Sequence, residues 1–316
     1  GVLSFAVFFG LTFLTSGLQS IDAPTRLALL PDVVGPRLTP AGMSLNQVAG
    51  QLAMPIAMMM TGFLIDQFGF SGAYFVSAIG LGLAIFFILL MPYTPEAGQV
   101  RAVKGERYGF SEALLDIRVG LGFARRNNII LWLIILLVVM MSLAYPPTAS
   151  FGPTWVTTVV NVPIRDMGFV VMFWGVGSLI GAMLMARLAM FERRGLLIGI
   201  GAVLFSIGFL IFVYDYQVWN VVVGNLALGA GMTMTMVSST ILIQHIAPNE
   251  VRGRVMSIFQ LNMAFAQLMT MPVAILGQWL TLQVLFPWLA IATLVIVVLI
   301  LYFQPQILQS RIPKPS

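Results

Sequence analysis

The stretch Pro248-Asn249-Glu250-Val251-Arg252-Gly253-Arg254 is a short charged loop between two long apolar runs. Four residues in and after it repeat an earlier part of the chain at one offset of 217 positions: Pro31, Arg37, Met54 and Pro55 recur as Pro248, Arg254, Met271 and Pro272. In both places a charged loop led by a proline precedes an uncharged segment that contains a second proline. The pattern predicts a fold of two related halves.

Composition decides the environment of these halves. The chain is 59% hydrophobic and 9% charged, whereas soluble domains carry about 25% charged residues. Its uncharged runs reach the length of about 20 residues that a helix needs to cross a bilayer, and the run from Val255 to Ser310 is long enough for two such helices. The runs lack the alternating pattern of a membrane barrel. An all-α membrane protein is therefore expected.

Nine spans are predicted, at residues 1–22, 40–65, 70–92, 128–150, 167–190, 195–214, 217–245, 253–280 and 284–304. We expect an incomplete N-terminal half at 1–92, a linker at 93–127, a six-helix half at 128–304 and a tail at 305–316. The offset of 217 pairs residues 1–21 with 218–238 and leaves the spans between 128 and 214 unpaired. We therefore expect three further helices, roughly 90 residues, before Gly1 in a protein of twelve spans.

Basic residues set the expected orientation. Fifteen of the sixteen Lys and Arg fall on one side of the nine spans, and Arg165 falls on the other. Short loops rich in Lys and Arg stay in the cytoplasm, so the C-terminus is expected there. Because these charges are dispersed over several loops, a nucleic-acid partner is not expected. The linker contains apolar residues at helical spacing, which is typical of an amphipathic helix on the inner membrane surface or of a plain connector between two bundles.

Three segments resemble the major facilitator superfamily, and the likeness covers nearly the whole chain. They are Asp22-Ala-Pro-Thr-Arg26-Leu-Ala-Leu-Leu-Pro31-Asp32, the loop from Pro248 to Ser257, and Gly181-Ala-Met-Leu-Met-Ala-Arg187 with Arg193-Arg194-Gly195. The closest likeness is to bacterial exporters that include enterobactin exporters and macrolide efflux pumps. One departure is clear: where such exporters carry Gly-Pro-x-x-Gly-Gly, residues 54–59 keep only Pro55.

The resemblance implies a secondary active transporter that exports a small hydrophobic or amphiphilic molecule, of the drug or siderophore class, by alternating access. It also implies coupling to protons and a place in the bacterial cytoplasmic membrane, and we expect a monomer. The alternative is a lipid-handling or non-transporting membrane protein on the same fold. We find no paired carboxylates, catalytic triad, metal-ligand cluster or phosphate loop, so neither an enzyme nor a cofactor or metal site is expected.

Three sets of residues are candidates for function. Amides inside the spans are costly in lipid unless they meet a partner or a wet cavity, and those expected to line a substrate cavity, or else to bond between helices, are Asn46, Gln47, Gln51, Asn225, Gln260, Asn262 and Gln267. The charged residues expected to form a cytoplasmic gate, or else to serve only as membrane anchors, are Asp22, Arg26, Asp32, Arg37, Glu250, Arg252 and Arg254. The residues expected at close helix packing are Pro55, Gly62, Gly177, Gly181 and Pro272.

Methionines and carboxylates complete the set of expectations. Methionine adapts to irregular apolar ligands, and clusters around Met58 and Met232 suit such a cargo, although most methionines are expected in ordinary packing. Proton coupling needs a titratable group in the membrane. The spans after residue 128 contain none at mid-depth, because Asp166 and Asp215 fall at predicted outer ends and His245 at an inner end. Either the coupling carboxylate lies in helices that precede Gly1, or the driving force enters otherwise. The resemblance implies the first, because related exporters often carry acidic residues there.

Overall fold

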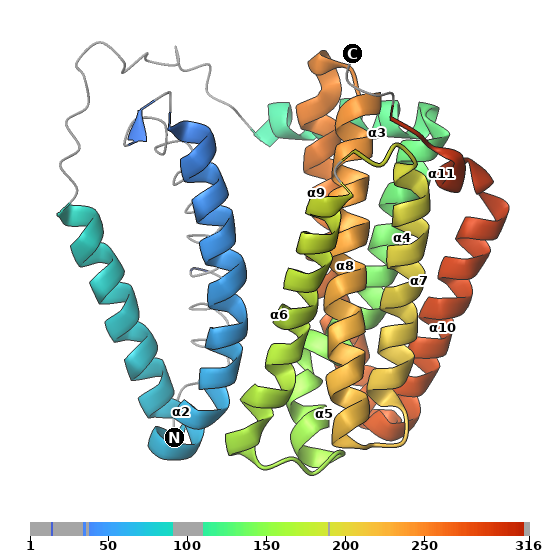
Figure 1. Cartoon of the computed structure of the whole chain (residues 1–316). Coiled ribbons are helices and arrows are strands. Elements are labelled where there is room, and N and C mark those ends of the chain that lie inside the picture. Colours follow the sequence, from blue (N-terminus) through green and yellow to red (C-terminus); the bar gives the residue numbers. More distant parts are fainter. Residues whose placement is uncertain (1–13, 15–33, 36–37, 91–109, 189, 313–316) are drawn as a thin grey trace. The chain divides into compact units, whose positions relative to one another are not determined.

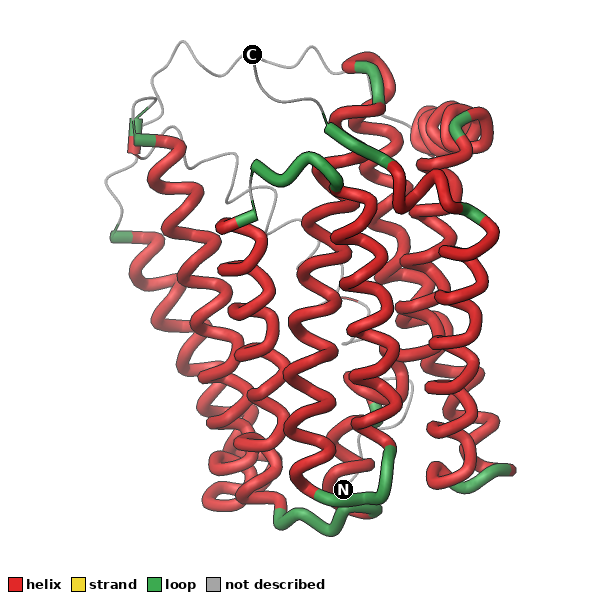
Figure 2. Tube along the Cα trace, turned by 45° about the vertical axis from the view of Figure 1, so that its right-hand side comes forward, coloured by secondary structure: helices red, strands yellow, loops and turns green. Residues whose placement is uncertain are grey.

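The computed structural model describes residues 14, 34–35, 38–90, 110–188 and 190–312. Every regular element among these residues is helical, and none of them lies in a strand (Figure 2). The all-α fold expected from composition is thus confirmed. Apolar side chains cover most faces of these helices, which is the pattern of helices that meet either protein or lipid on all sides.

The helices, labelled in Figure 1, are α2 (Thr39–Leu89), α3 (Phe110–Arg126), α4 (Asn128–Tyr145), the π-helix η1 (Pro146–Ser150), α5 (Gly152–Thr158), α6 (Ile164–Arg187), α7 (Arg194–Val213), α8 (Val218–Ile246), α9 (Asn249–Trp279), α10 (Leu282–Phe303) and α11 (Pro305–Gln309). The chain divides into two compact units. One comprises residues 1–53 and 85–100, and the other comprises residues 54–84 and 101–316.

Seven helices among the described residues are long and apolar enough to cross a membrane. Predicted spans 40–65 and 70–92 fall on the single helix α2, which is interrupted at Gly69, where φ is 67° and ψ is 178°. Glycine adopts this positive φ without the steric cost that a Cβ would add. The predicted span 1–22 lies outside the described residues, except for Leu14. The described part therefore contains the remaining predicted spans, with two of them joined in α2.

Helices α6, α7 and α8 form the most intimate packing in the larger unit. Glycines bring their backbones together: a Cβ added at Gly181 of α6 would lie 2.8 Å from the carbonyl oxygen of Ala230 in α8, and one added at Gly224 of α8 would lie 2.6 Å from the backbone nitrogen of Phe212 in α7. A Cβ added at Gly177 of α6 would overlap the carbonyl oxygen of Leu226 in α8. Helices without hydrophobic driving force between them associate through such close contacts.

Helix α4 packs against α9 and α10, and α3 packs against the first part of α9. A Cβ added at Gly120 of α3 would lie 3.0 Å from the carbonyl oxygen of Arg254. Residues Phe110–Arg126, in the segment predicted to hold an amphipathic helix or a connector, thus form a helix that packs against the first turns of α9, where the predicted charged loop is helical. Its last turn carries Arg125 and Arg126, where positive charge is favourable to the helix dipole.

The C-terminal segment folds back on the start of α7. The backbone nitrogen of Gly195 donates to the carbonyl oxygen of Ser310 at 3.1 Å, and the backbone nitrogen of Ile312 donates to the carbonyl oxygen of Glu192 at 2.9 Å. Helix α11 thereby covers the first turn of α7, and Ile307 is buried there. This end of α7 is opposite to the turn at 214–217 that leads into α8.

Candidate functional site

The larger unit encloses a cavity of about 390 Å³, a size typical of small-molecule sites. Its lining comes from α2, α4, η1, α5, α6, α7, α8 and α9, with these residues: Met58, Thr61, Met141, Tyr145, Thr148, Ala149, Pro153, Met167, Gly168, Val171, Trp174, Phe205, Asn225, Met232 and Met263. None of these residues carries a charge. Five are methionines and three are aromatic, so the described lining is apolar with a few neutral polar groups.

Glycines of α8 set the positions of two aromatic lining residues. A Cβ at Gly229 would meet the backbone of α6 at Trp174, and Ser178 Oγ of α6 donates to the Gly229 carbonyl oxygen at 3.4 Å. A Cβ at Gly231 would lie 2.5 Å from the backbone nitrogen of Phe205 in α7. Because both neighbouring helices approach α8 this closely, Trp174 and Phe205 are fixed at the cavity wall.

A break in α4 places the polar groups of the opposite wall. Pro146 and Pro147 have no N–H, so the carbonyls four residues earlier lose their α-helical donors. The chain continues as a π-turn, in which the backbone nitrogen of Phe151 donates to the carbonyl oxygen of Pro146 at 2.8 Å. Such π-segments are frequent at functional sites. Here the break brings Tyr145, Thr148 and Pro153 to the cavity.

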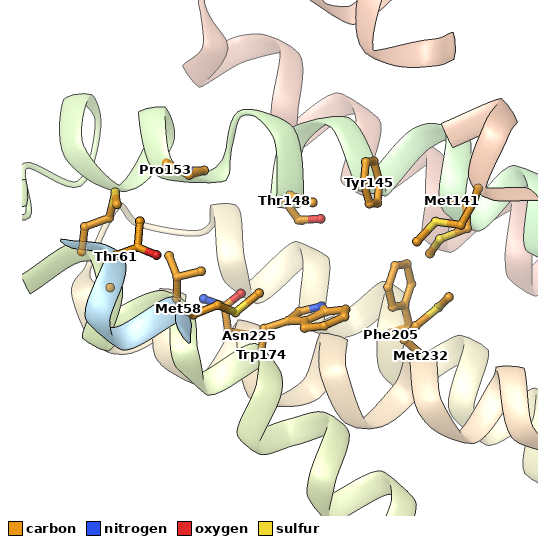
Figure 3. A pocket seen from close by; sticks show the side chains of 15 residues that line it. Met58, Thr61, Met141, Tyr145, Thr148, Pro153, Trp174, Phe205, Asn225 and Met232 are labelled. Carbon is orange, nitrogen blue, oxygen red and sulfur yellow. The ribbon is translucent and has the colours of Figure 1, made fainter. Parts of the chain in front are cut away.

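Asn225 is the most deeply buried polar residue of the lining, with 3% of its surface exposed. Its Nδ2 donates to the carbonyl oxygen of Val170 in α6 at 3.2 Å. Loss of hydrogen bonding by a buried amide costs about 1–3 kcal/mol, so this contact fixes the side chain. Figure 3 shows the amide between Met58 and Trp174.

The two ends of the cavity differ in polarity. In Figure 3 Thr61 and Asn225 lie toward one end, Thr148 and Trp174 lie near the middle, and Met141, Phe205 and Met232 lie toward the other. Thr61 and Asn225 thus lie away from Met141, Phe205 and Met232, with Met58 beside the amide. This arrangement fits a ligand with one polar end and an apolar body.

Asn225 is the one predicted cavity amide in the described lining. Asn262 of α9 is buried instead in the helix packing, where Nδ2 donates to the carbonyl oxygen of Phe259 and Oδ1 has no partner among the described residues. Gln260 and Gln267 are exposed on α9, and Asn46 is exposed on α2. Gln47 and Gln51 belong to α2, but their side chains lie outside the described set.

Of the predicted gate residues, the structure describes the three in the first turns of α9. Arg252 is half-buried and its Nε donates to the carbonyl oxygen of Ala247, at the end of α8, at 3.3 Å. Glu250 and Arg254 are exposed in the first turns of α9. A carboxylate at a helix N-terminus and a guanidinium at a helix C-terminus both match the helix dipoles. Asp22, Arg26, Asp32 and Arg37 lie outside the described residues.

The predicted packing residues of α2 contact α6 beside the cavity. A Cβ added at Gly62 would lie 2.7 Å from the carbonyl oxygen of Ile164, and one added at Gly175 would lie 2.6 Å from Cγ of the buried Pro55. Pro272 is exposed within α9. The proline and the glycine of α2 thus hold Met58 and Thr61, which lie between them in sequence, against the cavity.

The sequence predicted Met58, Met232 and Asn225 of this lining, but not its aromatic residues or its threonines. The Pro146-Pro147 pair within an apolar run was the available signal, because adjacent prolines break a helix. Which face of α6 or α7 meets the cavity was not available from periodicity, since these helices are apolar on all sides. The described residues contain no group of three or more His, Cys, Asp or Glu placed to hold a metal.

Comparison with known proteins gives one family. The sequence pattern of the Major Facilitator Superfamily matches residues 2–271 and 150–314. A stretch of 100 residues is 34% identical to the hexose transporters HXT13 and HXT17 of Saccharomyces cerevisiae, and it covers 31% of this chain. The match spans 18% of the length of those two relatives.

Solved structures resemble the chain over most of its length. The nucleoside transporter NupG aligns with a TM-score of 0.66 at 14% identity, over 87% of this chain and 73% of that one. A bacterial homologue of the iron transporter ferroportin, in an inward-facing state, aligns with a TM-score of 0.61 at 17% identity, over 89% of this chain and 66% of that one. At such identities the likeness concerns the fold.

Proposed function

The chain belongs to the major facilitator superfamily of membrane transporters, and we propose that its cargo is a small hydrophobic or amphiphilic molecule carried by alternating access. The observation that carries the proposal is the cavity of about 390 Å³ lined by five methionines, three aromatic residues and no charged residue among those described. Unbranched thioether side chains adapt to irregular apolar ligands, and aromatic side chains provide large contact areas.

A hexose is a poorer match to this lining. A sugar buries several hydroxyls, and each hydroxyl without a partner costs about 1–3 kcal/mol. The described lining offers polar side-chain atoms only at Thr61, Tyr145, Thr148, Trp174 and Asn225. Apolar surface predominates, which supports an apolar cargo with few polar groups.

Direction and energy source are further parts of the proposal. We propose that the C-terminus lies in the cytoplasm, on the basis of the one-sided distribution of Lys and Arg. Export across a bacterial cytoplasmic membrane is proposed from the resemblance of the sequence to bacterial exporters. We propose that protons drive the cycle through a carboxylate outside the cavity described here, since no lining residue that the structure describes is acidic. No bound cofactor and no nucleic-acid partner enters this scheme, and we propose that a monomer suffices.

The cytoplasmic gate is proposed at the first turns of α9, which carry the charged stretch that the sequence predicted as a loop. Arg252 binds the end of α8, and the backbone at Arg254 contacts Gly120 of α3. Rocking of the helices would alter both contacts together. These turns would therefore report on, and bias, the opening of the cavity toward the cytoplasm.

Flux through proteoliposomes tests the proposal. Purified full-length protein is reconstituted, and efflux of a fluorescent amphiphile is followed with and without an imposed pH gradient, with protein-free vesicles as the control. We expect saturable efflux that the gradient accelerates. Movement of labelled phospholipid, with no efflux of any amphiphile, would instead support the lipid-handling alternative.

A further inference from the structure

We propose that the cavity selects an uncharged amphiphile with a hydroxyl or N–H at one end, and that Asn225 Oδ1 accepts the hydrogen bond from this donor. The inference rests on the proposed function, because it takes the cavity as the place where the cargo is held. It goes further by assigning a chemical group to the polar end of that cargo and a residue that recognises it.

The orientation of Asn225 follows from its fixed hydrogen bond. The Val170 carbonyl can only accept, so the amide group that meets it at 3.2 Å must be Nδ2. The other branch of the amide is then Oδ1, an acceptor. The hydrogen bonds formed among the described residues include none to Asn225 Oδ1, although the residue is 97% buried and lines the cavity. An acceptor that lines a cavity and is not used within the protein can take its hydrogen bond from a donor on the cargo.

The two threonines of the lining also present acceptors. Thr61 Oγ1 donates to the Ala57 carbonyl oxygen at 2.8 Å, and Thr148 Oγ1 donates to the Ala144 carbonyl oxygen at 2.6 Å. Their hydroxyl protons are therefore used within their own helices, and the oxygen lone pairs remain. Tyr145 and Trp174 add donors between them and the apolar end. A cargo hydroxyl, which both donates and accepts, can satisfy both kinds of group.

The same acceptors could attract an ammonium ion, but the absence of charge from the described lining opposes it. Transfer of an unpaired cation out of water is strongly unfavourable, and none of the lining residues that the structure describes is a carboxylate. At the other end Met141, Phe205 and Met232 form apolar surface, and thioether sulfur makes favourable contacts with aromatic rings. An aromatic body with a neutral hydroxyl therefore fits the whole length.

Three probes with one apolar body test this assignment: 4-hydroxybiphenyl, its methyl ether, and biphenyl-4-ylmethylammonium. Equilibrium binding of each to purified full-length protein is measured. We expect the hydroxyl probe to bind about tenfold more tightly than the ether, which is the effect of one buried hydrogen bond, and the ammonium to bind most weakly. Asn225→Leu should abolish the preference for the hydroxyl over the ether.

Two further variants make the result specific. Asn225→Asp keeps the size of the side chain, and burial in the uncharged lining favours its neutral carboxyl form. That form can still donate to the Val170 carbonyl oxygen and present an acceptor to the cavity, so the hydroxyl preference should persist. Asn220→Leu makes the same change as Asn225→Leu on the same helix, at a residue whose Nδ2 donates to the Tyr214 carbonyl oxygen outside the cavity. It should leave the hydroxyl preference intact.

Equal binding of hydroxyl and ether probes to the natural protein would overturn the assignment. So would loss of the hydroxyl preference in Asn225→Asp, which remains informative even if Asn225→Leu does not fold. Flux of the hydroxyl probe in proteoliposomes separates this inference from the proposed function. Selective binding without flux refutes transport and leaves the assignment standing, whereas flux without hydroxyl preference does the reverse.

Discussion

At the scale of single residues, close backbone contacts between helices position two aromatic residues of the cavity. Trp174 stands at the point where α6 meets Gly229 of α8, and Phe205 where α7 meets Gly231. The backbone of each residue is thus held in place by the close contact between two helices. Their contribution to cargo binding is therefore expected to be pre-organised, with little entropy lost on binding.

Trp174→Ala is expected to weaken binding of an aromatic cargo by about tenfold, because it removes an aromatic contact and part of the apolar wall. Equilibrium binding of 4-hydroxybiphenyl to the purified variant measures the loss. Trp219→Ala is the matched control, since Trp219 is 75% exposed near the start of α8 and is not part of the described lining. Comparable losses in both variants would show that the effect is not local to the cavity.

Arg254→Ala tests the proposed gate. Transport is expected to fall by up to about fivefold with membrane insertion unchanged, because exposed charged contacts are worth about 0–1 kcal/mol. Initial efflux rates and the amount of protein in the membrane are measured together. Arg165→Ala, at an exposed arginine expected on the opposite side of the membrane, serves as control. An unchanged initial efflux rate in a well-inserted Arg254→Ala protein would show that the arginine serves only as a topological anchor.

At the scale of elements, α8 organises the larger unit. Its glycines admit α6 on one side and α7 on the other, and the cavity lies against the same helix through Asn225 and Met232. The broken helix formed by α4, η1 and α5 supplies the facing wall. The closely packed α8 thus faces a broken helix. Broken helices commonly form binding sites within membranes.

Gly177→Ala is expected to destabilise the protein by about 1–3 kcal/mol, since its Cβ would overlap the backbone of α8 at Leu226. Thermal unfolding in detergent measures the shift. Gly122→Ala in α3 makes the same change where a Cβ meets nothing within 4 Å among the described residues. That control should gain up to about 1 kcal/mol from helix propensity. A Gly177→Ala protein as stable as this control would contradict the close packing of α6 against α8 at this position.

At the scale of the whole molecule, the proposed repeat relates the turns of one half to those of the other. The turn between α9 and α10 at residues 280–281 shifts by the offset of 217 to residues 63–64, whereas α2 is interrupted at Gly69. In two halves related as the sequence suggests, the segment that precedes this turn differs in length by a few residues. The positions of Pro55 inside α2 and Pro272 inside α9 are compatible with the repeat.

Orientation is testable because the chain has no cysteine. Gln217→Cys places a thiol at the turn between α7 and α8, and Gln309→Cys places one at the opposite end of α7, where α11 lies. Both residues are exposed. In intact cells a membrane-impermeant maleimide should label Gln217→Cys and spare Gln309→Cys until the cells are opened. The reverse pattern would invert the proposed topology.

The sequence by itself determined the environment, the helical class and nearly every span, because the requirement to satisfy backbone groups in lipid leaves long apolar helices as the solution. It also identified the family and the charged loop from Pro248 to Arg254. It could not determine which residues share a cavity, since helices that are apolar all round carry no periodic signal of the face they present. Only the tertiary structure brought Asn225 to the cavity with Trp174 and Thr148 and left Asn262 in the helix packing, because close glycine contacts and the Pro146-Pro147 break set how each helix is turned.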